Sequence, residues 1–271
     1  MRQASLVAFY GAKPPRLESF LRRCQNQIHE VLHERAAGIG FRAYAVEQIH
    51  ATVIGLERQA RSGLANRNFQ AVRGCSKVMR LPRLFEFLVN CSYLPFEAQF
   101  GGFGDRDWPF QSRGARPYAR SFSLQGTIPV AIGWPCRAEI AGGGRPLGGT
   151  ASSSARTRVY PRVLEDLRRS AERFNVLHRW HREPSDADND LYLRLGRLER
   201  ELPGPQREWL EGRIRRALSA APPLIVRLAV SDLMVVSRPA DDETLAQARS
   251  RVVPLADPRL QDKDFIAALY D

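Results

Sequence analysis

His50 and Thr52 lie two residues apart in the run 49–56, where apolar and polar residues alternate. Such alternation is typical of a β-strand, on which side chains two residues apart point to the same face. An imidazole can take up or release a proton near neutral pH, and a hydroxyl can bind an anionic oxygen. The spacing therefore places a possible acid or base and a possible anion-binding hydroxyl on the same face of the strand. The alternative is a strand histidine whose polar atoms are satisfied by its neighbours.

A second group of such residues lies further along the chain. His178 and His181 are followed by Asp186, Asp188 and Asp190 at alternate positions. Three interpretations stay open. A histidine could take part in catalysis or phosphate binding, or imidazole and carboxylate ligands could hold a divalent metal. In the third, the aspartates form a polar turn and the histidines end a helix, where positive charge is favoured.

Arginine and aromatic residues are interleaved between residues 101 and 120, a stretch that is also rich in glycine. This mixture suits single-stranded RNA, because bases stack on aromatic rings and guanidinium groups bind phosphate. We therefore expect an exposed loop that contacts nucleic acid, although most of its aromatic rings are expected in the core. The arginines assigned to this role are Arg106, Arg113, Arg116 and Arg120.

The clearest loop spans residues 141–158 and is rich in Gly, Ser and Arg. It divides the chain roughly in half and is expected to be a linker or lid. Its glycines are not followed by the Gly-Lys-Ser/Thr of a P-loop. The alternative to a plain linker is phosphate binding through Arg145, Arg156 and Arg158.

The composition of the 271 residues favours a polyanionic partner. Lys and Arg number 41 against 29 Asp and Glu, a formal net charge of +12. RNA or another nucleotide comes first, although nearly all these cations are arginines and genome composition could produce that bias. Four scattered cysteines without zinc-ligand spacing indicate a reducing compartment. Since neither a signal peptide nor a membrane span is evident, we expect a cytoplasmic protein without a membrane partner.

The hydrophobic pattern predicts the elements that must position these residues. Helical spacing predicts helices after Pro15, around 84–89, after Pro161 and around 209–218, with strands between them. This order favours an α+β fold of two α/β lobes with antiparallel or mixed sheets. Residues 1–239 would form one two-lobed domain whose lobes meet near 141–158. Residues 240–271 would be a C-terminal extension on the surface.

A His-x-Thr tripeptide in a strand, preceded by a strand-helix-strand unit, resembles the first signature of the two-histidine phosphoesterases. This family includes 2′-5′ RNA ligase-like proteins and cyclic nucleotide phosphodiesterases. The phrase here is Ile49-His50-Ala51-Thr52-Val53, and the order of elements from Leu6 to about Pro239 is also similar. The resemblance implies two lobes facing a central cleft, His50 as acid or base, and Thr52 as a phosphate contact. It implies acid/base chemistry without a metal or other cofactor.

This chain departs from the family at the position of the second signature. On the strand where a second His-x-Thr is expected, Asp190 and Tyr192 take the two positions. An aspartate is normally ionised at neutral pH and is then a poor proton donor. Asp190 could still act as a base and Tyr192 as a hydrogen-bond donor, with His178 or His181 assisting.

These observations predict a phosphoesterase-like hydrolase acting on RNA ends or on small 2′,3′-cyclic or 2′,5′-linked nucleotides. The alternative is a catalytically degenerate RNA-binding or complex-forming subunit with the same fold, which the altered second motif favours. A two-lobed RNA-processing endonuclease of the repeat-RNA type should carry its glycine-rich loop near the C-terminus. The glycines lie in the middle here, which counts against that class.

Overall fold

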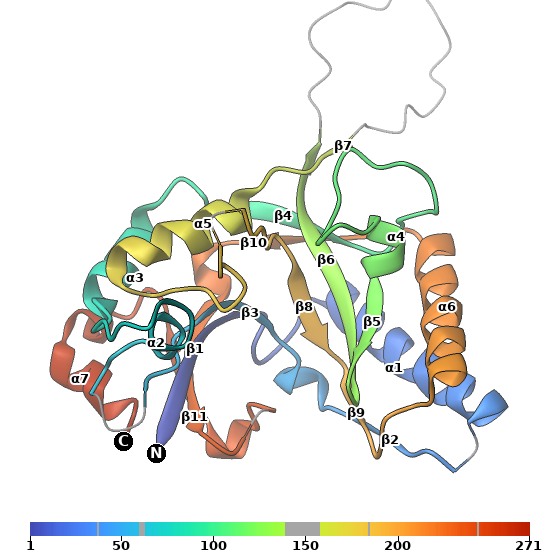
Figure 1. Ribbon diagram of the computed structural model, residues 1–271, viewed down its shortest axis with the longest axis horizontal. Coiled ribbons are helices and arrows are strands. Elements are labelled where there is room, and N and C mark those ends of the chain that lie inside the picture. Colours follow the sequence, from blue (N-terminus) through green and yellow to red (C-terminus); the bar gives the residue numbers. More distant parts are fainter. Residues whose placement is uncertain (37, 60–62, 139–157, 184, 243) are drawn as a thin grey trace, which may run out of the picture.

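The computed structural model describes residues 1–271 except 37, 60–62, 139–157, 184 and 243. The fold is α+β, and its centre is a ten-stranded antiparallel sheet with the order β10-β4-β6-β8-β3-β1-β11-β12 (Figure 1). The strands β5 and β7 pair with β6 beside this path. The bounds are β1 (Arg2–Ala8), β3 (Ala51–Gly55), β4 (Phe96–Phe100), β5 (Phe122–Gln125), β6 (Ile128–Ala138), β7 (Arg158–Val159), β8 (Leu191–Arg194), β10 (Leu224–Leu228), β11 (Leu233–Pro239) and β12 (Arg251–Pro254).

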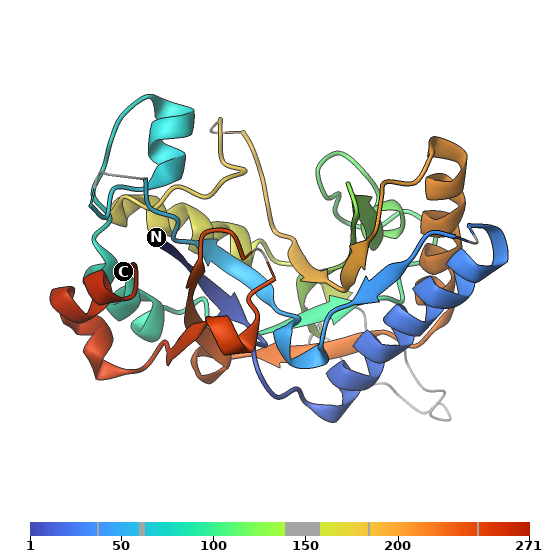
Figure 2. The ribbon, with the colours of Figure 1, turned by 90° about the horizontal axis from the view of Figure 1, so that it is seen from below.

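The helices gather at the two ends of the sheet. At one end α1 packs against α6, and at the other α5 packs on β3 with α3 and α7 nearby (Figures 1 and 2). A separate two-stranded sheet joins β2 (Phe41–Ala43) to β9 (Gly196–Leu198). The helices are α1 (Pro15–Arg35), α2 (Arg67–Arg73), α3 (Leu81–Asn90), α4 (Pro117–Arg120), α5 (Val163–Ala171), α6 (Gly204–Ala220) and α7 (Lys263–Ala268).

The helix α1 forms where the sequence predicts it. Pro15 occupies its first turn, where the missing N–H costs nothing, and the side chains of one face are buried. That face includes Leu17, Leu21 and Ile28, each with 0% exposure. The predicted helices α3, α5 and α6 and the predicted strands β3 and β8 are likewise confirmed.

The contact between β3 and β8 joins the two halves of the large sheet. It consists of a single paired position, Ala51 opposite Leu193. Both side chains are fully buried in the main core. Because side chains alternate along a strand, the residues that flank this pair point to the opposite face of the sheet.

The C-terminal segment beyond residue 239 differs from the expected surface extension. Its strand β12 pairs with β11 and extends the sheet, and Arg2 N–H donates to the Tyr270 carbonyl at 3.2 Å. Leu260, Ile266 and Tyr270 are buried in the core. Ile266 and Tyr270 are four residues apart, a helical spacing, but a pattern this short gives only a weak signal of burial in the sequence. The segment is an integral part of the fold, and both termini lie side by side (Figures 1 and 2).

Candidate functional site

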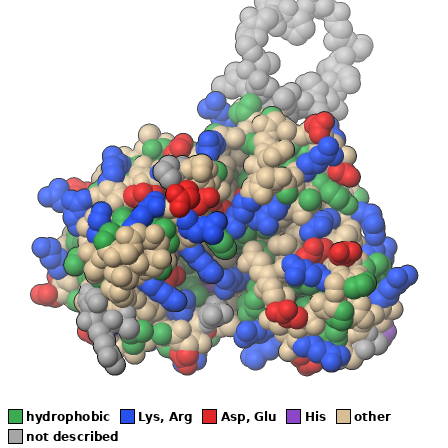
Figure 3. Space-filling view, viewed as in Figure 1, with side chains coloured by type: hydrophobic (Ala, Val, Ile, Leu, Met, Phe, Trp, Pro, Cys, Tyr) green, Lys and Arg blue, Asp and Glu red, His purple; other side chains and the backbone are tan. Residues whose placement is uncertain are grey.

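The face of the sheet opposite α1 carries the His-x-Thr residues. His50, one residue before β3, and Thr52 flank Ala51, while Tyr192 and Arg194 flank Leu193 on β8. The register therefore brings two residues from each half of the chain to the same face. Figure 1 looks onto this face, and Figure 3 shows Lys and Arg side chains gathered around a hollow in its middle.

The His50 imidazole is held in one tautomer. Its Nδ1 lies 2.7 Å from the carbonyl oxygen of Gln48, which can only accept, so Nδ1 carries the proton and Nε2 is left as an acceptor. The ring also meets Tyr10 edge-on, with 6.1 Å between centroids. Burial lowers the pKa of His50 to about 4, and nearby cations add to this effect against the opposing Gln48 hydrogen bond. His50 is a neutral base at neutral pH.

Lys13, Arg194 and Arg238 are the cations whose charges act on His50. Lys13 Nζ donates to the carbonyl oxygens of Gly11 at 2.7 Å and Glu47 at 3.3 Å. Burial lowers the pKa of Lys13 to about 8. Within the described residues, none of the three forms an ion pair with a carboxylate. Half-buried cations without carboxylate partners are suited to binding an anion.

The Asp188 carboxylate, in contrast, is fully buried and fully paired. Arg168 and Arg113 each place a guanidinium nitrogen 3.2 Å from it, and His178 Nε2 donates to it at 2.7 Å. Burial alone would raise the pKa of Asp188, but Arg168, His178 and Arg113 hold it well below its usual range. This carboxylate stays ionised and has no free position for a ligand.

Asp190 is held in the same way. Its carboxylate accepts hydrogen bonds from Ser112 at 2.7 Å, Arg120 at 2.9 Å, Trp134 Nε1 at 2.6 Å and the Tyr192 hydroxyl at 2.8 Å. Four donors occupy the lone pairs that a base would need. Burial and the two aspartates raise the pKa of Tyr192 far above its usual range. Asp190 and Tyr192 therefore share a face with His50 and Thr52, but they are engaged with one another.

Arg168 ties this carboxylate network to the strand that carries Thr52. Its guanidinium has 1% exposure and donates at 2.8–3.1 Å to the backbone carbonyls of Thr52, Val53, Asp188 and Asp190. A buried cation that binds four carbonyl oxygens and a carboxylate links β3 to the segment before β8. The network therefore fixes the geometry of the face on which His50 lies.

Of the two histidines of the second group, His178 belongs to this network through Asp188, and His181 packs against the His178 ring. Burial, with the charge of Arg168, lowers the pKa of His178 to about 3 despite its hydrogen bond to Asp188. His181 is fully buried against the His178 ring, and burial lowers its pKa to about 4. Asp186 accepts from the backbone N–H groups of Arg182 and Glu183, as in a polar turn. In the part of the chain that the structure describes, no group of three metal-ligating side chains comes together.

The arginines assigned to nucleic acid fall into different environments. Arg113 and Arg120 face the buried carboxylates, with side-chain exposures of 26% and 20%. Arg116 is exposed and paired with Asp105 and Asp107, and Arg106 lies over the Trp108 ring. Arg158 lies half-buried in β7. Arg145 and Arg156 fall outside the described residues.

Sequence reasoning missed four cations of the site, namely Lys13, Arg168, Arg194 and Arg238. Arg194 had a signal, because it follows Tyr192 by two residues in the alternating strand. Lys13 and Arg238 lie in distant parts of the sequence, and only the folded chain brings their charges to His50.

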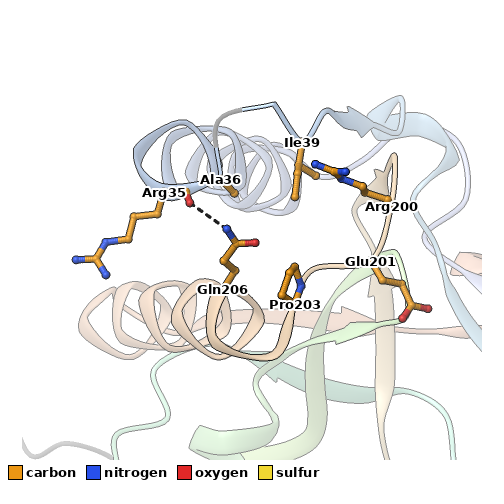
Figure 4. A pocket seen from close by; sticks show the side chains of 7 residues that line it. All are labelled: Arg35, Ala36, Ile39, Arg200, Glu201, Pro203 and Gln206. Carbon is orange, nitrogen blue, oxygen red and sulfur yellow. Dashed lines mark hydrogen bonds between the residues drawn. The ribbon is translucent and has the colours of Figure 1, made fainter.

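Two of the cavities at the surface of the described residues differ in their position relative to the site. The larger, about 350 Å³, lies between the end of α1 and the start of α6, where Gln206 donates to the Arg35 carbonyl at 3.4 Å (Figure 4). It contains none of the site residues. The smaller, about 140 Å³, adjoins Asp190 and is bounded by Phe110, Trp134 and Tyr160.

No family model matches the chain, and no curated protein matches it. Among the described helices, none combines the length and apolarity needed to cross a bilayer.

Proposed function

We propose that this protein binds the phosphate of RNA ends or of small 2′,3′-cyclic or 2′,5′-linked nucleotides on the His50 face, and that His50 acts there as a general base. One observation carries the proposal: the His50 Nε2 makes no hydrogen bond with a described residue, and the three cations whose charges act on this imidazole have no carboxylate partner among the described residues. A phosphate ester supplies the missing negative charge, and an attacking hydroxyl or water supplies the proton.

The proposed step is hydrolysis of a cyclic phosphate. His50 Nε2 takes a proton from water as the water oxygen forms a bond to phosphorus. The bond between phosphorus and one ribose oxygen breaks, and that oxygen recovers the proton from the imidazolium. Lys13 and Arg194 would balance the charge that develops on the phosphate oxygens. The Thr52 hydroxyl, on the same face, would bind one of those oxygens.

The two-lobed arrangement belongs to the same proposal. The halves of the sheet meet at one paired position between β3 and β8, and His50 and Arg194 flank that position from opposite halves. We assign each half to one lobe of a phosphoesterase-like fold, with the substrate lying over the joint.

A binding function without turnover is the second candidate, and the state of Asp190 and Tyr192 favours it. Both groups are engaged in a buried network, so the second half of the site offers no free acid or base. Such a protein would hold RNA on the basic face and release it unchanged.

The decisive experiment incubates the purified protein, with and without EDTA, with RNA oligonucleotides ending in a 2′,3′-cyclic phosphate. His50→Ala is compared with His33→Ala, a change at an exposed histidine on α1. General-base catalysis predicts turnover that falls about 100-fold or more in His50→Ala, survives in His33→Ala and is indifferent to EDTA. Salt-sensitive binding without turnover in the wild type would establish the second candidate instead.

A further inference from the structure

The cavity beside Asp190 has the chemistry of a site for a flat heteroaromatic ring. Phe110, Trp134 and Tyr160 form its apolar wall, and the Phe110 and Tyr160 centroids are 4.6 Å apart. Gln111 and Arg162 stand at its exposed edge. The Gln111 amide makes no hydrogen bond with another described residue, so both its donor and its acceptor are available.

This cavity opens on the same face of the sheet as His50. Trp134 belongs to an aromatic cluster that covers this face of β6, and Tyr192 packs against the same cluster. Thr52 flanks the paired position next to Tyr192 on the neighbouring strand. The aromatic cavity, Tyr192 and His50 therefore lie along one face of the sheet, and the Arg113 guanidinium lies over the Tyr192 ring between them.

The strand register gives the separation of the two places. Trp134 lies level with Asp190 on β8, and His50 lies level with Arg194. Two strand spacings across the sheet and four residues along β8 separate them, which amounts to roughly 16 Å. A ligand that reaches from one to the other must be longer than a mononucleotide.

We propose that the aromatic cavity is a nucleobase-binding subsite, and that the protein selects an oligoribonucleotide whose terminal phosphate lies at His50 while an upstream base stacks against Phe110 and Tyr160. The inference rests on the proposed phosphate site. The base presents its face to the rings and its polar edge to the Gln111 amide, as aromatic platforms bind single-stranded RNA. The volume of about 140 Å³ is several times the ~30 Å³ that a water molecule occupies.

The test measures the dissociation constants of an adenylate trimer with a 2′,3′-cyclic phosphate, of the same trimer with abasic upstream positions, and of adenosine 2′,3′-cyclic phosphate. Phe110→Leu keeps an apolar side chain but removes the flat ring. Phe87→Leu is the matched control, since this half-buried ring packs against Tyr93 and Phe174 away from the cavity. We expect Phe110→Leu to weaken trimer binding about tenfold and to leave the mononucleotide unchanged.

The outcomes separate the subsite from the phosphate site. If Arg194→Gln weakens trimer binding but Phe110→Leu and abasic upstream positions do not, the nucleobase subsite is overturned and the proposed function stands. Trimer binding indifferent to both Arg194 and Phe110 would overturn both. If Phe110→Leu does not fold, photo-crosslinking of a 5-iodouridine trimer to the wild type serves instead. Crosslinks at Phe110, Trp134 or Tyr160 would support the subsite, and crosslinks confined to other residues would overturn it.

Discussion

Two tripeptide patterns with the same spacing, His50-x-Thr52 and Asp190-x-Tyr192, lie next to one another in the sheet and have opposite surroundings. His50, which shares its face with Thr52, is near cations that have no carboxylate partner among the described residues, whereas Asp190 and Tyr192 are occupied by several hydrogen bonds. The position in the strand brings both pairs of side chains to one face, but the groups that surround each pair determine whether its polar atoms are free to bind a ligand. In our proposal the first pair binds a ligand, whereas the second pair is part of a buried hydrogen-bond network.

The largest expected effect comes from breaking the second pair's network. Asp188→Asn removes a fully buried charge that neutralises Arg168 and Arg113. Loss of one partner from a buried ion pair leaves the others uncompensated, so the free energy of unfolding should fall by about 3–5 kcal/mol. Urea denaturation of the variant and the wild type measures this difference in the free energy of unfolding.

Asp107→Asn is the matched control for this change. Its carboxylate has 93% exposure and pairs with Arg116 at the surface, where an ion pair contributes about 0–1 kcal/mol. Equal effects of the two changes would show that the buried network has no special structural role.

A smaller loss of stability is expected from acid, and replacing His178 shows how much of it comes from the second region. The pKa of His178 in the folded chain is about 3, against about 6.5 in an unfolded chain. Between these values the unfolded chain binds a proton that the folded chain does not, so the free energy of unfolding falls as pH drops from about 6.5. At pH 4.5 the loss from His178 should be about 2–3 kcal/mol relative to pH 7.

The replacement His178→Gln checks this assignment, because a glutamine amide can still donate to Asp188 but does not titrate. Urea denaturation at pH 7 and pH 4.5 should show a smaller acid loss in the variant than in the wild type. His50 and His181, whose pKa values are lowered to about 4, keep contributing in both proteins. An unchanged acid loss in His178→Gln would assign the effect to those two residues.

Local patterns in the sequence predicted most of the elements and the shared face of two candidate site residues. Alternation predicted that His50 and Thr52 share a face, and helical spacing predicted α1, α3, α5 and α6. The partners of these residues depend on which strands pair, and no local pattern encodes the pairing of β3 with β8 across more than a hundred residues. Arg113 and Arg120 illustrate the limit. The composition of the segment around them suggested RNA contacts, but in the fold these two arginines face Asp188 and Asp190.

The smallest expected effect concerns Arg194, one of the cations near His50 that have no carboxylate partner among the described residues, and it tests whether such cations bind phosphate. Arg194→Gln should weaken binding of a cyclic-phosphate RNA several-fold and lower the slope of log affinity against log salt by about one, because it removes one phosphate contact. Arg116→Gln is the control, since this arginine is exposed but already paired with Asp105 and Asp107. Titrations at several salt concentrations measure both. If the two variants lower affinity and salt slope equally, phosphate is held by the overall positive charge rather than by the unpaired cations around His50.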